Sequence, residues 1–223
     1  MDFIFMLTRG DKTILDGIEV IDTIAKCGVT HIGFKDVGVD KQTLISLTDR
    51  IREIGATSYI EVVSTTSEDI YNSLAVAAEL GVDRVLGGQD VGQALDILKD
   101  CGAEYYPFPG KPAGHPTKLG GTPDDIARDC ENMMATGCAG VDLLAYRATD
   151  CDPLDLVRAA KGSMNGGYLI VAGSVDSPER IRALAGAGAD AFTIGTAVFD
   201  GSFSPNKGAI QSQCRDVLAA CEG

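Results

Sequence analysis

Two short segments in the last third of the chain have the composition of turns that bind anions. Ile170–Val175 and Phe192–Ala197 each pass from apolar residues to a glycine that is followed by a hydroxyl residue. A stretch of helical composition, 177–186, lies between them. Because glycine has no Cβ, backbone amides at such turns can approach an anion closely. The residues that we expect to bind a phosphate are Gly173, Ser174, Gly195 and Thr196.

Three charged residues lie inside apolar segments that alternate in the manner of strands. In the segment 30–35, Ile32 and Phe34 share the face that would pack against helices. Because side chains alternate along a strand, Lys35 then points toward the interior. The same alternation points Glu61 inward beside Lys35. It also points Asp142 inward, so that Asp142 faces these two residues across the interior. We therefore expect Lys35, Glu61 and Asp142 to be the catalytic residues.

The chemistry of these three residues depends on how they are paired. Burial would lower the pKa of Lys35 and make it a base or an amine nucleophile. A pair of Lys35 and Glu61 is suited to proton transfer, and Asp142 opposite them is suited to a mechanism with one acid and one base. Two alternatives stay open: Glu61 only neutralises Lys35, or Asp142 is a hydrogen-bonded residue of the core.

Other polar residues follow the predicted strands and are candidates for binding a substrate. Arg9 and Asp11 come directly after the first strand, and Arg147 comes after the sixth. His115 lies in a long segment, 107–122, that combines prolines, glycines and two lysines and is predicted to have no regular structure. Loops of this length are often lids or binding loops, although a contact between subunits is an alternative.

A repeated unit of helix, glycine and strand must position these residues. Glycine commonly ends a helix, and its recurrence at 28, 55, 81, 102, 137 and 188 marks helix-to-strand joins, with a variant at 166–167. Together with a strand at the N-terminus, the joins predict eight parallel strands, and hence one (β/α)8 TIM barrel domain spanning residues 1–223. The strands are predicted at 2–8, 30–35, 58–63, 84–87, 104–108, 140–146, 168–172 and 191–195. The helices are predicted at 14–27, 40–54, 67–80, 91–100, 123–136, 153–161, 177–186 and 207–221.

Composition narrows the classes of function. A net charge of −13 argues against nucleic acid as a partner, and the absence of a long apolar run argues against a membrane span. The seven cysteines form no Cys-x-x-Cys pair and the chain has two histidines, so we expect reduced thiols, no metal and a cytoplasmic location. The first strand is followed by no dinucleotide fingerprint, and we expect no cofactor. The sequence leaves a homo-oligomer open.

The motif Ala172-Gly173-Ser174-Val175, together with Gly195-Thr196-Ala197, resembles the second half of the ribulose-phosphate-binding barrels. These are (β/α)8 enzymes that hold a phosphate after strands 7 and 8. The resemblance implies the same fold and a phosphate site at these two turns. It does not extend to a metal-binding histidine set of epimerases or to a Schiff-base lysine at the end of the sixth strand.

The leading hypothesis is an enzyme that acts on a small phosphorylated carbonyl or sugar metabolite by proton transfer next to the carbonyl, as an isomerase or epimerase. The first alternative is an aldolase or lyase that uses Lys35 on a phosphosugar. The second is a regulatory barrel that binds a phosphorylated metabolite without catalysis.

Overall fold

The computed structural model describes residues 1–114 and 117–222, and it contains one sheet of eight parallel strands. The strands follow one another in the order β10–β11–β12–β1–β4–β5–β6–β7. Their bounds are β1 Asp2–Met6, β4 His31–Lys35, β5 Thr57–Val62, β6 Arg84–Gly87, β7 Glu104–Tyr106, β10 Gly140–Leu143, β11 Tyr168–Val171 and β12 Ala191–Ile194.

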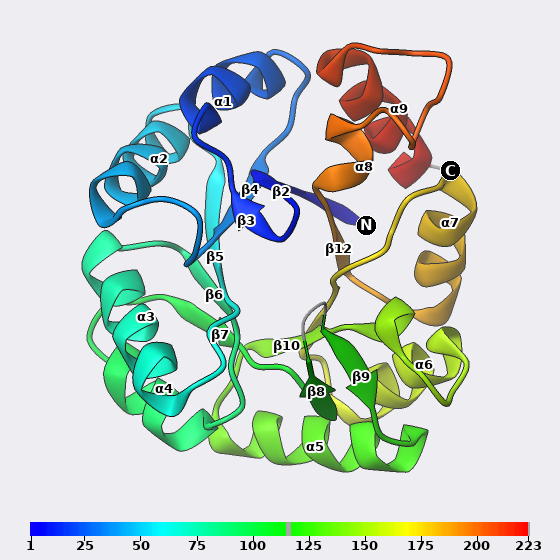
Figure 1. Ribbon diagram of the computed structural model, residues 1–223. Helices are drawn as coiled ribbons and strands as arrows, with labels where there is room; N and C mark the ends of the chain where they lie inside the picture. Colours follow the sequence, from blue (N-terminus) through cyan, green and yellow to red (C-terminus); the bar gives the residue numbers. More distant parts are fainter. Residues whose placement is uncertain (115–116, 223) are drawn as a thin grey trace.

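The two ends of this sheet meet and nearly close a barrel. The amide of Ala139 donates to the carbonyl of Tyr105 at 3.1 Å, and the amide of Asp142 donates to the carbonyl of Pro107 at 3.0 Å. These bonds join β10 to the β7 side of the sheet. In Figure 1 the strands form an inner ring and the helices an outer ring, so the predicted (β/α)8 barrel is confirmed.

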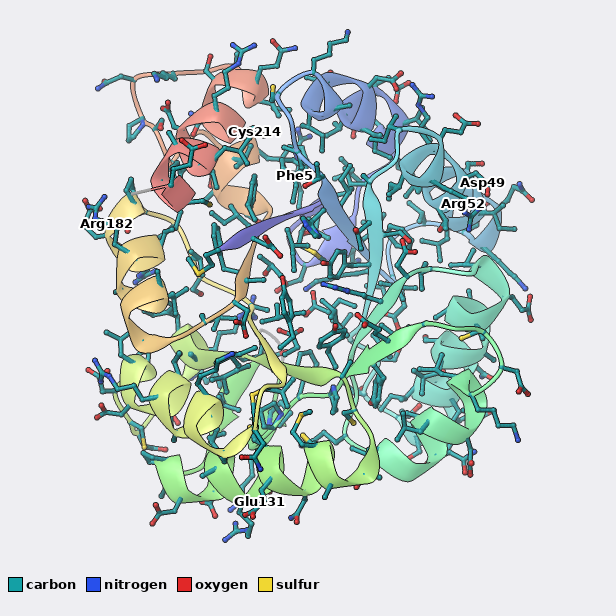
Figure 2. The ribbon with its side chains drawn as sticks, turned by 180° about the vertical axis from the view of Figure 1, so that it is seen from behind. Phe5, Asp49, Arg52, Glu131, Arg182 and Cys214 are labelled. Carbon is teal, nitrogen blue, oxygen red and sulfur yellow. The ribbon has the colours of Figure 1, made fainter. Side chains whose placement is uncertain are left out.

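The helices cover the outside of the barrel. Figure 2 shows Asp49, Arg52, Glu131 and Arg182 on the outer side of the helices, while Phe5 lies on the barrel wall. The bounds are α1 Gly17–Ala25, α2 Lys41–Glu53, α3 Ser67–Leu80, α4 Val91–Leu98, α5 Pro123–Thr136, α6 Pro153–Ser163, α7 Pro178–Ala187, α8 Thr196–Phe199 and α9 Ile210–Glu222.

Alternation along the strands divides the apolar residues into two layers. Ile32, Ile60 and Val62 belong to the large cluster between the strands and the helices. A smaller cluster fills the inside of the barrel; it consists of Ile4, Met6, Tyr59, Leu86, Tyr106, Ile170 and Ala191. Alternation with these outer residues places Glu61, between Ile60 and Val62, on the inward face, as predicted.

A polar cluster fills the amino-terminal end of the barrel. The guanidinium of Arg84 donates to the hydroxyl of Tyr59 at 2.8 Å and pairs with Glu104 at 2.9 Å. It also lies 4.9 Å from the ring centre of Tyr168 and 5.6 Å from that of Tyr106. In (β/α)8 barrels this end serves stability, and the opposite, carboxyl end carries function.

The structure adds elements that the sequence did not predict. Two short antiparallel hairpins, β2 (Thr8–Arg9) with β3 (Lys12–Thr13) and β8 (Lys111–Ala113) with β9 (Lys118–Gly120), are drawn inside the ring of helices in Figure 1. The prediction of 107–122 as a segment without regular structure was thus wrong. The sixth strand, predicted to run to 146, ends at Leu143, and a 3-10 turn, η1 (Ala145–Arg147), follows it.

No helix within the described part of the chain is both long and apolar enough to span a membrane.

Candidate active site

A cavity of about 820 Å³ opens at the carboxyl ends of the barrel strands. Its lining comes from the ends of β1, β4 and β5, from the β8–β9 hairpin, and from the turns that follow β11 and β12. The predicted catalytic residues Lys35 and Glu61 and the predicted phosphate-binding turns therefore share one cavity, and Asp11 and Arg147 also line it.

Lys35 and Glu61 are neighbours across the β4–β5 ladder and nearly buried, with exposed fractions of 7% and 6%. Lys35 Nζ lies 3.5 Å from Glu61 Oε2 and 2.8 Å from Asp11 Oδ1. The lysine thus bridges two carboxylates. A buried cation is stable only with such partners, because burial alone strongly disfavours a charge.

The expectation that the pKa of Lys35 is lowered is wrong. Burial does lower it, but the negative charge of Glu61 and the hydrogen bond and charge of Asp11 together outweigh burial, and the pKa is raised. Lys35 is consequently an ammonium ion at neutral pH, able to stabilise negative charge, and not a free amine.

The β2–β3 hairpin positions both Lys35 and Asp11. The hydroxyl of Thr13 accepts a hydrogen bond from the amide of Lys35 and donates one to its carbonyl, each at 2.8 Å. The two-residue loop of the hairpin, Gly10 and Asp11, has φ values of 56° and 61°. A residue other than glycine in this left-handed region costs about 1–2 kcal/mol, so the fold holds the Asp11 carboxylate over Lys35 against a local preference.

Asp142 lies on the inward face of β10, in register with Ile170 of the inner apolar cluster, and its exposed fraction is 0%. Neither carboxyl oxygen has a hydrogen-bond partner within residues 1–114 and 117–222. Burial first, and then the negative charge of Glu61, raise its pKa well above the usual value, against the opposing effects of Lys35 and Arg147. The pKa of Asp142 is therefore well above that of an ordinary carboxyl. Asp142 does not line the cavity and is a fully buried residue of the barrel interior, as the core alternative expected, but its carboxyl has no hydrogen bond within the described residues.

Arg147 extends from η1 toward the Asp11 carboxylate and the turn after β11. Its Nη2 lies 3.4 Å from Asp11 Oδ1, and its Nη1 lies 3.4 Å from the carbonyl of Thr117. A Cβ placed on Gly173 would be 2.5 Å from Arg147 Nε. Glycine at this position, where φ is 79°, thus leaves room for the guanidinium.

The two turns predicted to bind phosphate follow neighbouring strands, β11 and β12, and both line the cavity. Ser174 has a left-handed backbone, with φ of 58°. Among the described residues, no acceptor pairs with the backbone amides of these turns, which are those of Gly173, Ser174, Gly195 and Thr196. Unpaired amides beside a cavity are a common feature of anion-binding sites.

Two of the predicted substrate-binding residues are not brought into this group. The guanidinium of Arg9 lies 4.5 Å from the ring centre of Phe199, and Arg9 does not line the cavity. His115 lies outside the described residues.

The sequence analysis missed Thr193, a buried hydroxyl residue of β12 that lines the cavity. The sequence could have identified Thr193, because it lies between Phe192 and Ile194, two residues before Gly195. Alternation along the strand points a residue at this position inward.

No protein-family model and no curated protein matches the chain. Solved structures do. The tryptophan synthase complex from Pyrococcus furiosus matches with a TM-score of 0.69 at 15% identity, over 100% of this chain and 98% of that one. Thiamine phosphate pyrophosphorylase from Pyrococcus furiosus matches with a TM-score of 0.68 at 13% identity, over 99% and 95%. Orotidine 5'-phosphate decarboxylase from Pyrococcus horikoshii OT3 matches with a TM-score of 0.65 at 14% identity, over 99% and 99%.

Identities this low establish the fold and leave the reaction to the site itself. The chain shares along its full length the (β/α)8 barrel of these enzymes, and the resemblance expected from the sequence is confirmed at the level of fold.

Proposed function

We propose that this protein is an enzyme that binds a small phosphorylated carbonyl compound and moves a proton next to the carbonyl, as an isomerase or epimerase does. The observation that carries the proposal is one cavity with two chemically distinct regions. Unpaired amides lie at the turns after β11 and β12, and the Lys35–Glu61 pair lies at the ends of β4 and β5. Two of the structural neighbours are named for phosphorylated compounds, which agrees with the first region.

In this reaction Glu61 takes the proton from the carbon next to the carbonyl. The electron pair of the broken C–H bond moves onto the carbonyl oxygen, and the ammonium group of Lys35 stabilises the resulting enediolate. Delivery of a proton to the former carbonyl carbon, together with transfer of the hydroxyl proton to the former carbonyl oxygen, gives an isomer. Delivery of a proton to the opposite face of the original carbon gives an epimer. The proposed reaction requires no cofactor, because the base Glu61, the cation Lys35 and a proton donor suffice.

The aldolase alternative is less well supported. Formation of an imine needs a neutral amine, and the two carboxylates beside Lys35 raise its pKa. Borohydride reduction in the presence of phosphorylated ketones and aldehydes tests this point. A covalent adduct on Lys35 would favour the lyase.

One observation favours the non-catalytic alternative. Asp11 and Glu61 both form ion pairs with Lys35, which is also the way in which a binding protein would neutralise a buried lysine. The fully buried Asp142, which has no partner among the described residues, is not explained by such a role.

The experiment that tests the proposal is hydrogen exchange into substrate. The protein is incubated in D2O with a set of aldose and ketose phosphates, and deuterium next to the carbonyl is measured by NMR. We expect at least one compound to exchange, and Glu61→Gln to lower the rate about a hundredfold or more. Arg158→Gln, on the exposed side of α6, is the control and should exchange normally. The proposal fails if no compound exchanges while the folded protein binds sugar phosphates.

We also infer that residues 1–223 form a single domain that works in a reducing compartment such as the cytoplasm. All seven cysteines are free thiols, which is the usual state there.

A further inference from the structure

Arg147 is the least satisfied cation of the cavity. The hydrogen bonds of its side chain within the described residues go to Asp11 and to the carbonyl of Thr117. Both are 3.4 Å long, beyond the range of a good hydrogen bond. Its Nε is buried and has no acceptor within the described ranges. A guanidinium is most stable when its fork of donors meets a planar or tetrahedral oxyanion in two bonds. The contacts of Arg147 within the described residues leave much of this capacity unused.

The position of Arg147 joins the two regions of the cavity. On one side, its Nε lies against Gly173, at the first of the two turns with unpaired amides. On the other side, its Nη2 faces the Asp11 carboxylate, which holds Lys35 at 2.8 Å. An anion that settles at the turn is therefore within reach of the same guanidinium that now faces Asp11.

Asp11 occupies its place at a local cost. Its left-handed backbone, with φ of 61°, is disfavoured for aspartate relative to glycine. Even so, its pKa is lowered, because the hydrogen bond and charge of Lys35 and the charge of Arg147 exceed the effect of burial. Asp11 is thus the anion that Lys35 and Arg147 share in this structure.

Building on the proposed function, we propose that Arg147 is the third wall of the phosphate site and that Asp11 competes with the ligand for it. When a phosphate monoester dianion binds at the turns, the Arg147 guanidinium exchanges the Asp11 carboxylate for the phosphate oxygens. Asp11 then interacts with Lys35 alone. Binding of the phosphate at β11 and β12 is in this way linked to the lysine at β4, and Arg147 is a specificity-determining residue for the dianion.

A double-mutant cycle with inorganic phosphate as the probe tests this exchange. Binding is measured by calorimetry on the full chain for the wild type, Asp11→Asn, Arg147→Gln and the double variant. We expect Arg147→Gln to weaken phosphate binding about ten- to hundredfold, since a charge-assisted contact is lost. We expect Asp11→Asn to strengthen it about tenfold, because the internal competitor is gone.

The double variant decides between exchange and a general charge effect. If Asp11 acts by competing for Arg147, the gain from Asp11→Asn disappears in the Arg147→Gln background. If the gain persists there, only the change in net charge matters and the inference is wrong. Arg158→Gln makes the same change of charge as Arg147→Gln at an exposed position of α6 and should bind phosphate like the wild type. Thermal unfolding of each variant verifies that it is folded.

The outcome also separates this inference from the proposed function. If the wild type binds phosphate and Thr196→Pro, at the first position of α8, abolishes binding, but the cycle shows no coupling, the phosphate site stands and the role of Arg147 falls. If the folded wild type binds neither inorganic phosphate nor sugar phosphates, both fall.

Discussion

At the scale of residues, the carboxyl of Asp142 has the most consequential environment. It is fully buried, it receives no hydrogen bond within the described residues, and Glu61 adds a nearby negative charge. Lys35 and Arg147 attract the ionised form but do not outweigh burial. The folded protein therefore holds a proton on Asp142 to a higher pH than the unfolded chain does, whose carboxyl has the usual pKa of 3.8.

This environment makes the stability of the protein depend on pH in a defined direction. A raised pKa in the folded state contributes stability that is fully present below pH 3.8 and is lost as the pH rises toward the folded pKa. Asparagine cannot ionise. We therefore expect the free energy of unfolding of Asp142→Asn, relative to the wild type, to increase by up to about 1.4 kcal/mol per pH unit as the pH rises from 3.8 to the pH at which Asp142 ionises in the folded protein. Urea unfolding over this range measures it.

The exposed Asp100→Asn is the matched control, because the folded and unfolded chains solvate that carboxyl alike. It should unfold with the pH dependence of the wild type. If the curves of Asp142→Asn and the wild type run parallel, the pKa of Asp142 is the same in the folded and unfolded protein, and the raised pKa inferred for it is wrong.

At the scale of elements, the start of α5 fixes the far end of the segment that carries the β8–β9 hairpin. The hydroxyl of Thr122 accepts from the amide of Asp125, and the carboxylate of Asp125 accepts from the amide of Thr122. We expect Thr122→Ala to lower the free energy of unfolding by about 1 kcal/mol, because this reciprocal cap is lost. Chemical denaturation measures it. Thr136→Ala, in the last turn of α5, is the control and should be neutral or slightly stabilising, since alanine favours helix. Equal losses would mean that the cap is not the cause.

The elements also show how far the sequence could predict the structure. Both bounds of α3 and α5 were predicted correctly, because each has a threonine cap at its start and a left-handed glycine at its end. The hairpin strands Lys111–Ala113 and Lys118–Gly120 were missed, since three residues that include a proline or a glycine carry no alternation. The early end of β10 was missed because Leu143 and Leu144 continue the apolar run into the turn that places Arg147.

The candidate site was predictable where alternation decides the direction of a side chain. Lys35 and Glu61 were expected to be inward and adjacent, and they are paired across β4 and β5. The pKa of Lys35 was not predictable, because its direction is the sum of burial, the charge of Glu61 and the contact with Asp11, and the hairpin that holds Asp11 over the lysine was absent from the prediction. The balance of these opposing effects on a pKa depends on the distances between the charged groups, whereas alternation in a sequence gives only the direction in which each side chain points.

At the scale of the whole molecule, the net charge of −13 opposes the ligand that the cavity is proposed to bind. The field of the surface carboxylates reaches about 30 Å at an ionic strength of 0.01 M but about 8 Å at 0.15 M. A phosphate dianion approaching from solvent therefore meets repulsion that salt removes, whereas its proposed contact with Arg147 inside the cavity is screened much less. We expect the association rate constant of phosphate to rise severalfold between these two ionic strengths, and NMR exchange rates measure it. Figure 2 shows Glu131 on the outer side of α5. The substitution Glu131→Lys should therefore make this rise of the rate constant smaller without changing the residues of the cavity. A rate that falls with salt would mean that the cations of the cavity, and not the acidic surface, control the approach of the anion.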